Sequence, residues 1–282
     1  MKRAAVLCSL LLCLLILCSC GGNINSEEET TTTTEITTTE DPTVRVTFPE
    51  GFTATQIAEK LQENGVCSAK EFMALVADDE YLSTLSYRFI SGIKNPENRP
   101  FNLEGYIFPD TYDFYKGESA EKALSRFLSN TEKKLTDEYY LRAEELGYTM
   151  DEIISLAAIV QEEATTANEM GKVSSVVHNR IVSPGYGKIQ CDVTIHYIND
   201  YVTDSPYLEG DTEKYKELYN TYKCVGLPEG AITNPGLDAI KAALYPEDTN
   251  YFFFVTDEDW NYYYAETYAE HKKNCAAVGL VG

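Results

Sequence analysis

The chain has 282 residues, with 45 acidic side chains against 23 basic ones, and its formal net charge is −22. A protein this acidic is repelled by the phosphate backbone that dominates nucleic-acid affinity, so nucleic acid is not an expected partner. The hydrophobic fraction of 44% is ordinary for a folded protein and excludes a wholly disordered chain.

The N-terminus has the features of an export signal. Lys2 and Arg3 precede an apolar run over residues 4–18, which is shorter than the roughly 20 residues of a membrane-spanning helix. The run ends in LCSCG at 17–21, which resembles a bacterial lipobox. We expect residues 1–19 to be a lipoprotein signal peptide and Cys20 to be the lipidated first mature residue. An uncleaved anchor helix and a plain secretory signal are the alternatives.

Residues 20–43 are expected to form a disordered tether after the lipidated cysteine. They hold nine Thr and six acidic residues, and apolar side chains that could form a core are nearly absent. Two acyl chains on Cys20 would hold the protein stably at a membrane. The expected location is therefore the extracytoplasmic face of the bacterial cytoplasmic membrane, with the folded part lifted off the surface.

The first part of the folded region, residues 44–100, predicts a small α/β module. Residues 44–48 alternate like a strand, and the capping boxes that begin at Thr53 and Ser68 each open a helix. A turn-rich segment at 95–100 ends the module. Residues 119–146 then show helical spacing of apolar side chains, which Gly147 ends. The class is α+β, with a second domain over 101–282.

The helix that opens at the capping box of Thr149 carries a carboxylate on its apolar side. At about 100° per residue, Glu163 falls beside Leu156 on the apolar stripe, whereas Glu162 falls on the opposite, solvent side. Burial favours the protonated form of a carboxyl group, which a general acid needs at neutral pH. Glu163 is therefore a candidate acid. The alternative is that it only forms an ion pair, with Arg180 as a possible partner.

The rest of the chain predicts a further helix over 172–182 and short strands near its end. Residues 251–255 read as a buried strand, and 262–264 as its neighbour. The cysteines outside the signal fit no metal pattern and could be free buried thiols or disulfides; they are Cys67, Cys191, Cys224 and Cys275. The three histidines are far apart in sequence, so no metal site is expected.

Seven segments, in the same order, resemble the signature segments of the YceG-like endolytic murein transglycosylases (MltG). They are LEGYIFPDTY at 103–112, AAIVQEEA at 157–164, KVSSVVHNR at 172–180, IQCDVTIHY at 189–197, YNTY at 219–222, GLPEGAITNPG at 226–236 and EH at 270–271. The resemblance implies a YceG-like catalytic domain preceded by a truncated LysM-like module at 44–100.

The resemblance also implies an activity. Enzymes of this family cleave the MurNAc–GlcNAc bond of peptidoglycan without water and leave 1,6-anhydroMurNAc ends. The second Glu of the family's EKE segment, which is its catalytic acid, matches Glu163. One carboxyl group suffices and no metal or organic cofactor is required. The implied partners are peptidoglycan glycan strands, the membrane through Cys20, and enzymes of cell-wall synthesis.

Polar and aromatic residues in the matching loops are candidates for glycan binding, because sites tend to gather in loops. They are Gln190, Asp192, Tyr219, Asn220, Thr221, Tyr222 and Asn234. The same residues could instead form turns or pack in the interior.

The chain departs from the family pattern at several positions, which leaves a second hypothesis open. The first Glu of EKE is Gln161, a family Ser is Cys191, and a Gly-His pair is Asn261-Tyr262. A weakly active or inactive scaffold lipoprotein that binds peptidoglycan is therefore the alternative to an active enzyme. A solute-binding lipoprotein, suggested only by the lipobox and tether, is the third hypothesis.

Overall fold

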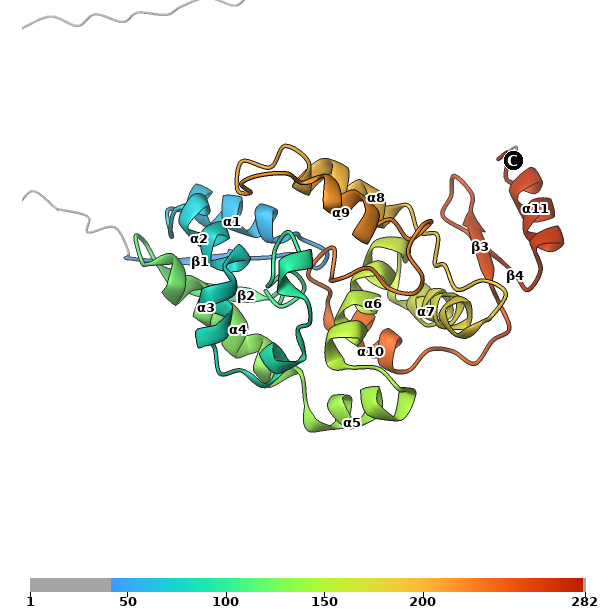
Figure 1. The fold of residues 1–282 in the computed structure, drawn as a ribbon, viewed down its shortest axis with the longest axis horizontal. Helices are drawn as coiled ribbons and strands as arrows, with labels where there is room; N and C mark the ends of the chain where they lie inside the picture. The colour runs from blue at the N-terminus through green and yellow to red at the C-terminus, as the bar shows by residue number, and fades with distance from the viewer. Residues whose placement is uncertain (1–41, 281–282) are drawn as a thin grey trace, which may run out of the picture. The chain divides into compact units, whose positions relative to one another are not determined.

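The computed structural model describes residues 42–280, so the expected signal peptide, Cys20 and nearly all of the expected tether lie outside the described residues. In this range the chain is mostly helical with two small antiparallel sheets, which confirms the α+β class (Figure 1). No helix within residues 42–280 is both long enough and apolar enough to span a membrane.

The first sheet joins two strands that are far apart in sequence. β1 (Thr43–Thr47) runs antiparallel to β2 (Thr111–Tyr115), with Thr43 opposite Tyr115 and Thr47 opposite Thr111. The predicted strand at 44–48 is thereby confirmed. The two strands lie on either side of the expected boundary at residue 100. The division into 44–100 and 101–282, and the LysM-like character of the first part, stay predictions.

Four helices pack around this sheet, and side chains cap their first turns. The Thr53 side chain accepts from the Gln56 amide in a complete capping box, as predicted, and Ser68 accepts from the Glu71 amide. The helices are α1 (Ala54–Glu63), α2 (Ala69–Ala77), α3 (Asp79–Thr84) and α4 (Ala120–Lys134). Two 3-10 turns, η1 (Arg88–Gly92) and η2 (Pro96–Asn98), lead to the segment that crosses the core.

Aromatic side chains fill the space between the sheet and these helices. Phe127 of α4 lies 5.0 Å from Phe48 and 6.1 Å from Phe72 of α2, measured between ring centroids, in edge-on geometry. Phe114 of β2 joins the same cluster at 6.1 Å from Phe48. These rings exclude water from the sheet's inner face and tie α2 and α4 to it.

The centre of the molecule is α6 (Met150–Glu163), whose capping box at Thr149 forms as predicted. It packs against α5 (Asp137–Leu146), α7 (Ala167–Val182) and α10 (Leu237–Leu244). Every residue from Ile153 to Val160 is buried. The prediction of a single apolar stripe was therefore too narrow, because neighbouring elements cover the middle of the helix on all sides, and its charged side chains lie in the first and last turns.

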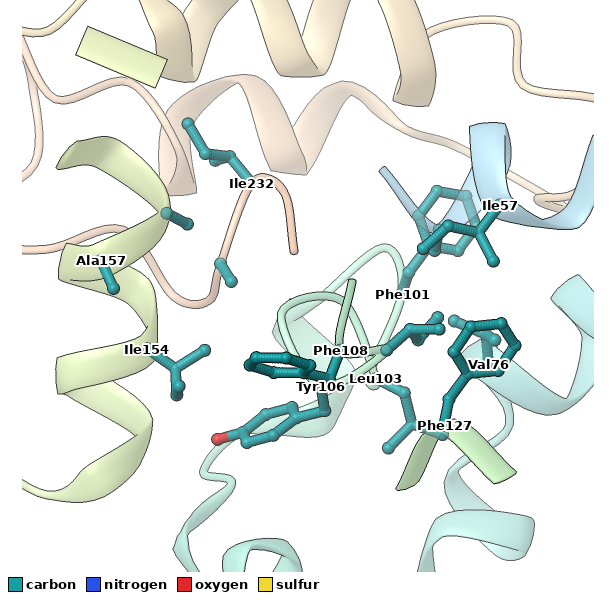
Figure 2. Packing of buried hydrophobic residues seen from close by; sticks show 14 of the residues in the cluster. Ile57, Val76, Phe101, Leu103, Tyr106, Phe108, Phe127, Ile154, Ala157 and Ile232 are labelled. Carbon is teal, nitrogen blue, oxygen red and sulfur yellow. The ribbon is translucent and has the colours of Figure 1, made fainter. Parts of the chain in front are cut away.

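The segment 101–108 connects α6 to the helices around the first sheet. Figure 2 shows Tyr106 and Phe108 between Ile154 of α6 on one side and Val76 and Phe127 on the other. The hydroxyl of Tyr106 donates to Asp151 Oδ1 at 2.7 Å. Asp151 also forms a buried ion pair with Arg99. The first turn of α6 is therefore held by a buried charged pair.

The C-terminal part contains three short helices, namely α8 (Val193–Tyr197), the π-helix η3 (Ile198–Val202) and α9 (Glu213–Leu218). The second sheet and α11 (Tyr268–Ala277) end the described chain. β3 (Phe253–Thr256) pairs with β4 (Tyr262–Ala265), as predicted. The expectation that the first of these strands is buried was wrong. A two-stranded sheet with a solvent side leaves β3 half-buried.

The four cysteines of the described part are free thiols. Cys191 is buried, and Cys67, Cys224 and Cys275 are half-buried.

Candidate active site

Glu163 is the last residue of α6, and its side chain emerges from the buried helix into a cavity. The cavity has a volume of about 290 Å³, and α6, α7, β3, α11 and the loops before α8 and after α9 contribute to it. Its lining includes both polar and aromatic side chains: Glu163, Arg180, Gln190, Cys191, Asp192, Tyr222, Phe252, Phe253, Phe254, Tyr268 and His271. Glu163 itself is half-buried.

Burial raises the pKa of Glu163 from its ordinary value to about 7. The carboxylates of Asp192 and Glu162 raise the pKa further, and a hydrogen bond from the Cys191 thiol opposes the shift. The position at the C-terminal end of a helix acts in the same direction as burial, because the negative end of the helix dipole disfavours a carboxylate. Glu163 can therefore hold a proton near neutral pH and release it again.

Arg180 of α7 lies in the same cavity but does not pair with Glu163. Its guanidinium donates to the carbonyl oxygens of Lys188 at 3.0 Å and Phe252 at 3.1 Å, and to the side-chain oxygen of Gln190. The ion pair between Arg180 and Glu163 that the sequence left open as an alternative does not form among the described residues. All the near contacts of Arg180 are neutral, so it fixes the loop around residue 190 and leaves Glu163 without a cation.

The loop that carries Gln190 and Cys191 is held by threonines. Gln190 has a positive φ of 60°, and its amide donates to the Thr221 carbonyl at 3.1 Å. The Cys191 amide donates to Thr221 Oγ1 at 3.0 Å, and Thr194 Oγ1 donates to the Cys191 carbonyl at the same distance. These bonds fix the Cys191 backbone so that its thiol faces Glu163.

One further contact lies in the cavity wall, and another lies beside the cavity at the end of α6. The Tyr222 hydroxyl donates to Asp192 Oδ1 at 2.8 Å, and both side chains are exposed. On another side, the hydroxyl of Tyr262 in β4 donates to the backbone oxygen of Glu163 at 2.7 Å and accepts from the Thr165 amide at 2.9 Å. Tyr262 therefore ties the end of α6 to the second sheet.

This fold and this site can be compared with those of known proteins. The model of the YceG-like family matches residues 23–277 of the chain. The chain belongs to the YceG-like family. A YceG-like protein of known structure from Listeria monocytogenes is 27% identical, with a TM-score of 0.67 over 82% of this chain and 75% of that one.

Two curated relatives within this similarity bear the name endolytic murein transglycosylase. The Bacillus subtilis protein is 27% identical over 237 residues, which is 81% of this chain and 63% of the relative. The protein of Streptococcus pneumoniae serotype 2 is 26% identical over 244 residues, which is 82% of this chain and 44% of the relative. This chain thus spans less than two thirds of the length of either relative.

The first part of the segment LEGYIFPDTY at 103–112, residues 103–109, is buried and lies away from the cavity, whereas Asp110 and Thr111 are exposed. Glu104 accepts from the Ala54 amide at 2.9 Å, from Asn234 Nδ2 at 2.8 Å and from the Tyr197 hydroxyl at 3.3 Å. A Cβ on Gly105, with φ of 91°, would lie 2.6 Å from that of Ala231. The segment therefore joins α1, α8 and the 231–234 loop.

The site residues predicted from the YceG-like segments fall into two groups. Gln190, Asp192 and Tyr222 line the cavity together with Glu163. The other four lie elsewhere. Tyr219 and Thr221 are buried, and Asn220 borders another cavity beside Thr194.

Asn234 is, like Thr221, a predicted site residue with no exposed surface. It is fully buried, and all its side-chain hydrogen bonds are to the protein. Its Oδ1 accepts from the amides of Gly105 at 3.0 Å and Ile107 at 2.8 Å, while Nδ2 donates to the carbonyl of Phe52 and to Glu104.

The two neighbours of Glu163 that raised questions in the sequence do not enter the cavity. Gln161 Oε1 accepts from the Gly236 amide at 3.0 Å and so holds the first turn of α10. Glu162 is exposed, as the helical wheel predicted, and faces Gly51. Gln161 therefore contacts the start of α10 and does not line the cavity that holds Glu163.

Sequence reasoning missed part of the cavity wall. Phe252, Phe254 and His271 line it, and His271 stacks on Phe253 with ring centroids 5.0 Å apart. The EH match at 270–271 was the signal for His271, but nothing local indicated which face of α11 it would occupy. Among the described residues no cluster of three His, Cys, Asp or Glu side chains could hold a metal ion.

Proposed function

We propose that this chain is an endolytic lytic transglycosylase that cleaves the MurNAc–GlcNAc bond of peptidoglycan glycan strands. One observation carries the proposal, namely an unpaired carboxyl group in a cavity, Glu163, whose pKa of about 7 lets it donate and accept a proton. Membership of the YceG-like family, with relatives named endolytic murein transglycosylase, supports this choice among acid-catalysed reactions.

In the proposed mechanism Glu163 acts twice. The protonated carboxyl group donates to the glycosidic oxygen as the bond to the MurNAc anomeric carbon breaks. The resulting carboxylate then takes the proton from the C6 hydroxyl of the same MurNAc, whose oxygen bonds to the anomeric carbon. The products are a 1,6-anhydroMurNAc end and a free GlcNAc hydroxyl, and Glu163 ends protonated. Because the nucleophile belongs to the sugar, a second catalytic carboxylate is not needed, unlike in most glycoside hydrolases.

Substrate contacts are proposed for the predicted residues that share the cavity with Glu163. Gln190 and Asp192 offer amide and carboxylate groups to sugar hydroxyls, and the exposed Tyr222 ring offers a stacking surface. For Tyr219, Thr221 and Asn234 the burial of the side chains supports a packing role.

We also propose that the enzyme works at the membrane surface. The lipobox-like segment and Cys20, followed by the Thr- and Glu-rich residues 20–43, support a lipid anchor and a tether at the extracytoplasmic face. Nascent glycan strands emerge at this surface, and enzymes of cell-wall synthesis would be the neighbouring proteins.

A digest tests the function. The full chain in detergent is incubated with purified peptidoglycan or uncrosslinked glycan strands, beside the Glu163→Gln variant, and products are identified by mass spectrometry. Products that end in 1,6-anhydroMurNAc, and that disappear with the variant, are the expected result. The exposed Glu121→Gln, on α4 and outside the cavity, serves as a control that should retain activity.

Two other results would contradict the proposal. Reducing ends would mean hydrolysis, and Asp192 would be the second carboxylate to test because it lines the same cavity. Glycan binding without any cleavage would favour the scaffold lipoprotein.

A further inference from the structure

One carboxylate, that of Asp257, accepts several hydrogen bonds within the turn between β3 and β4. Asp257 Oδ1 accepts from the backbone amides of Asp259 at 3.0 Å and Asn261 at 2.9 Å. Its Oδ2 accepts from Asn261 Nδ2 at 2.9 Å and from the Tyr263 hydroxyl at 3.0 Å. These bonds hold the pKa of Asp257 below its ordinary range. The turn is therefore a built structure that holds the residue at its tip in one place.

That residue is Trp260, the only tryptophan of the chain. Its ring is 65% exposed, although a tryptophan gains more from burial than almost any other side chain. Its backbone has a positive φ of 62°, in a region that L-residues other than Asn and Asp rarely adopt. Exposure and backbone strain at one residue, held by a dedicated turn, indicate a binding role.

The Trp260 ring borders an open hollow of about 600 Å³. The other groups around the hollow are hydroxyls, an amide and carboxylates, from Thr165, Thr166, Glu169, Asp259, Asn261 and Tyr262. A flat aromatic ring beside hydrogen-bonding groups matches a sugar, which has an apolar face and a rim of hydroxyls. The lining holds no cation, so a neutral N-acetylhexosamine fits better than an anionic ligand.

The hollow lies next to the backbone at the end of α6, where Glu163 is the last residue. Tyr262 belongs to its wall, and the hydroxyl of Tyr262 bonds both the Glu163 backbone oxygen at 2.7 Å and the Thr165 amide at 2.9 Å. Thr165, which also lines the hollow, follows Glu163 by two residues. Tyr262 and Thr165 therefore connect the hollow to the residue that carries the candidate acid.

We propose that Trp260 and this hollow, with Thr165 and Asn261, form a sugar subsite that holds the glycan strand beside the bond cleaved at Glu163. The proposal rests on the proposed function for its choice of ligand. Ring stacking on Trp260 binds the sugar, and the polar groups of the hollow orient it.

Binding can be measured without turnover, because Trp260 is the only indole in the protein. Full-length Glu163→Gln protein in detergent is titrated with glycan strands stripped of their peptides, and tryptophan emission is excited where tyrosine does not absorb. We expect a saturable change in emission and protection of the ring from acrylamide quenching. Oligomers of N-acetylglucosamine should give the same response more weakly.

Variants of the active enzyme give a second readout. Trp260→Ala should raise KM roughly tenfold with little change in kcat, because a lost stacking contact weakens binding of substrate and transition state alike. Trp260→Phe should restore much of the affinity. The matched control is Tyr115→Ala, which removes another exposed ring, from β2 at the other sheet (Figure 1).

The outcomes separate this proposal from the proposed function. An unchanged emission with glycan, together with a wild-type KM for Trp260→Ala, would overturn the subsite even if digestion yields anhydro ends. A clear emission response without any cleavage by the wild-type protein would support the subsite while the enzymatic function fails. An emission shift on reconstitution into phosphatidylglycerol vesicles, with no response to glycan, would assign Trp260 to the membrane and also overturn the subsite.

Discussion

At the scale of single residues, the chemistry depends on the protonation of Glu163. A general acid must carry its proton when substrate binds, and the protonated fraction falls as pH rises past its pKa. We therefore expect kcat/KM for glycan cleavage to decline as pH rises through about 7, the pKa that burial gives Glu163. Initial rates at low substrate concentration across pH 5 to 9 measure this, and a flat profile over that range would contradict the assignment.

The thiol of Cys191 is the group best placed to tune that pKa. It donates a weak hydrogen bond to Glu163, and such a bond favours the carboxylate and lowers the pKa. Cys191→Ser supplies a stronger donor and should move the alkaline limb of the pH profile to lower pH. Cys191→Ala removes the donor and should move it to higher pH.

The opposite directions of the two expected shifts in the pH profile distinguish a change in the pKa of Glu163 from damage to the fold. The Cys191 backbone is held by Thr221 and Thr194, and neither bond uses the thiol, so both variants keep the loop. Cys224→Ser and Cys224→Ala, at a half-buried thiol that does not line the cavity, are the matched controls and should leave the profile in place. Shifts of both Cys191 variants in the same direction would rule out this role.

At the scale of elements, the loop 101–108 is fixed to its neighbours through Asn234. Asn234→Ala leaves the amides of Gly105 and Ile107 and the carboxyl group of Glu104 short of partners inside the protein. Each buried unsatisfied group costs about 1–3 kcal/mol, so we expect the free energy of unfolding to fall by roughly 3 kcal/mol or more. Guanidinium unfolding measures it.

Asn220→Ala provides the comparison for Asn234→Ala. Its side chain accepts only the nearby Tyr222 amide, at 3.0 Å, so its loss should cost about 1 kcal/mol or less. Equal stability of Asn234→Ala and the wild type, with weaker glycan binding, would instead support the sequence-based assignment of Asn234 to the substrate.

The same elements show which features a sequence can predict. The caps at Thr53 and Thr149 and the side of α6 that carries Glu163 follow from residues within one or two turns, so local rules found them. The bond from Tyr262 to Glu163 joins residues 99 apart, and that from Gly105 to Asn234 joins residues 129 apart. Such pairs depend on the packing of whole elements, and no local pattern identifies them.

The residues of the candidate site also divide into those that the sequence could indicate and those whose position depends on the packing of whole elements. Glu163 was a candidate because a carboxylate on an apolar helix face is costly. Gln190 and Asp192 were candidates because they lie in loops of the segments that resemble the YceG-like family, and the same criterion also selected Asn220 and Asn234, which do not line the cavity. Arg180 and the aromatic wall at 252–254 look in sequence like ordinary helix and strand residues. Their place in the cavity depends on how α7 and the second sheet meet α6.

At the scale of the whole molecule, Glu104 makes stability depend on pH. It is 2% exposed, and burial raises its pKa from 4.5 to about 8 in spite of the bonds that it accepts from Ala54, Tyr197 and Asn234. Because the folded-state pKa is the higher one, the contribution of Glu104 to stability is fully present below pH 4.5. It is lost as pH rises toward about 8, at up to about 1.4 kcal/mol per pH unit.

Glu104→Gln should remove this dependence while keeping the network. The amide oxygen can accept from Ala54 and Asn234, and the amide nitrogen can donate to the Tyr197 oxygen. We expect variant and wild type to unfold with similar free energies near pH 5, and the variant to be the more stable near pH 8. Guanidinium unfolding at several pH values tests this, with the exposed Glu121→Gln as control. Parallel pH curves for Glu104→Gln and the wild type would mean that Glu104 is ionised throughout, and that the core which positions α6 tolerates a buried charge.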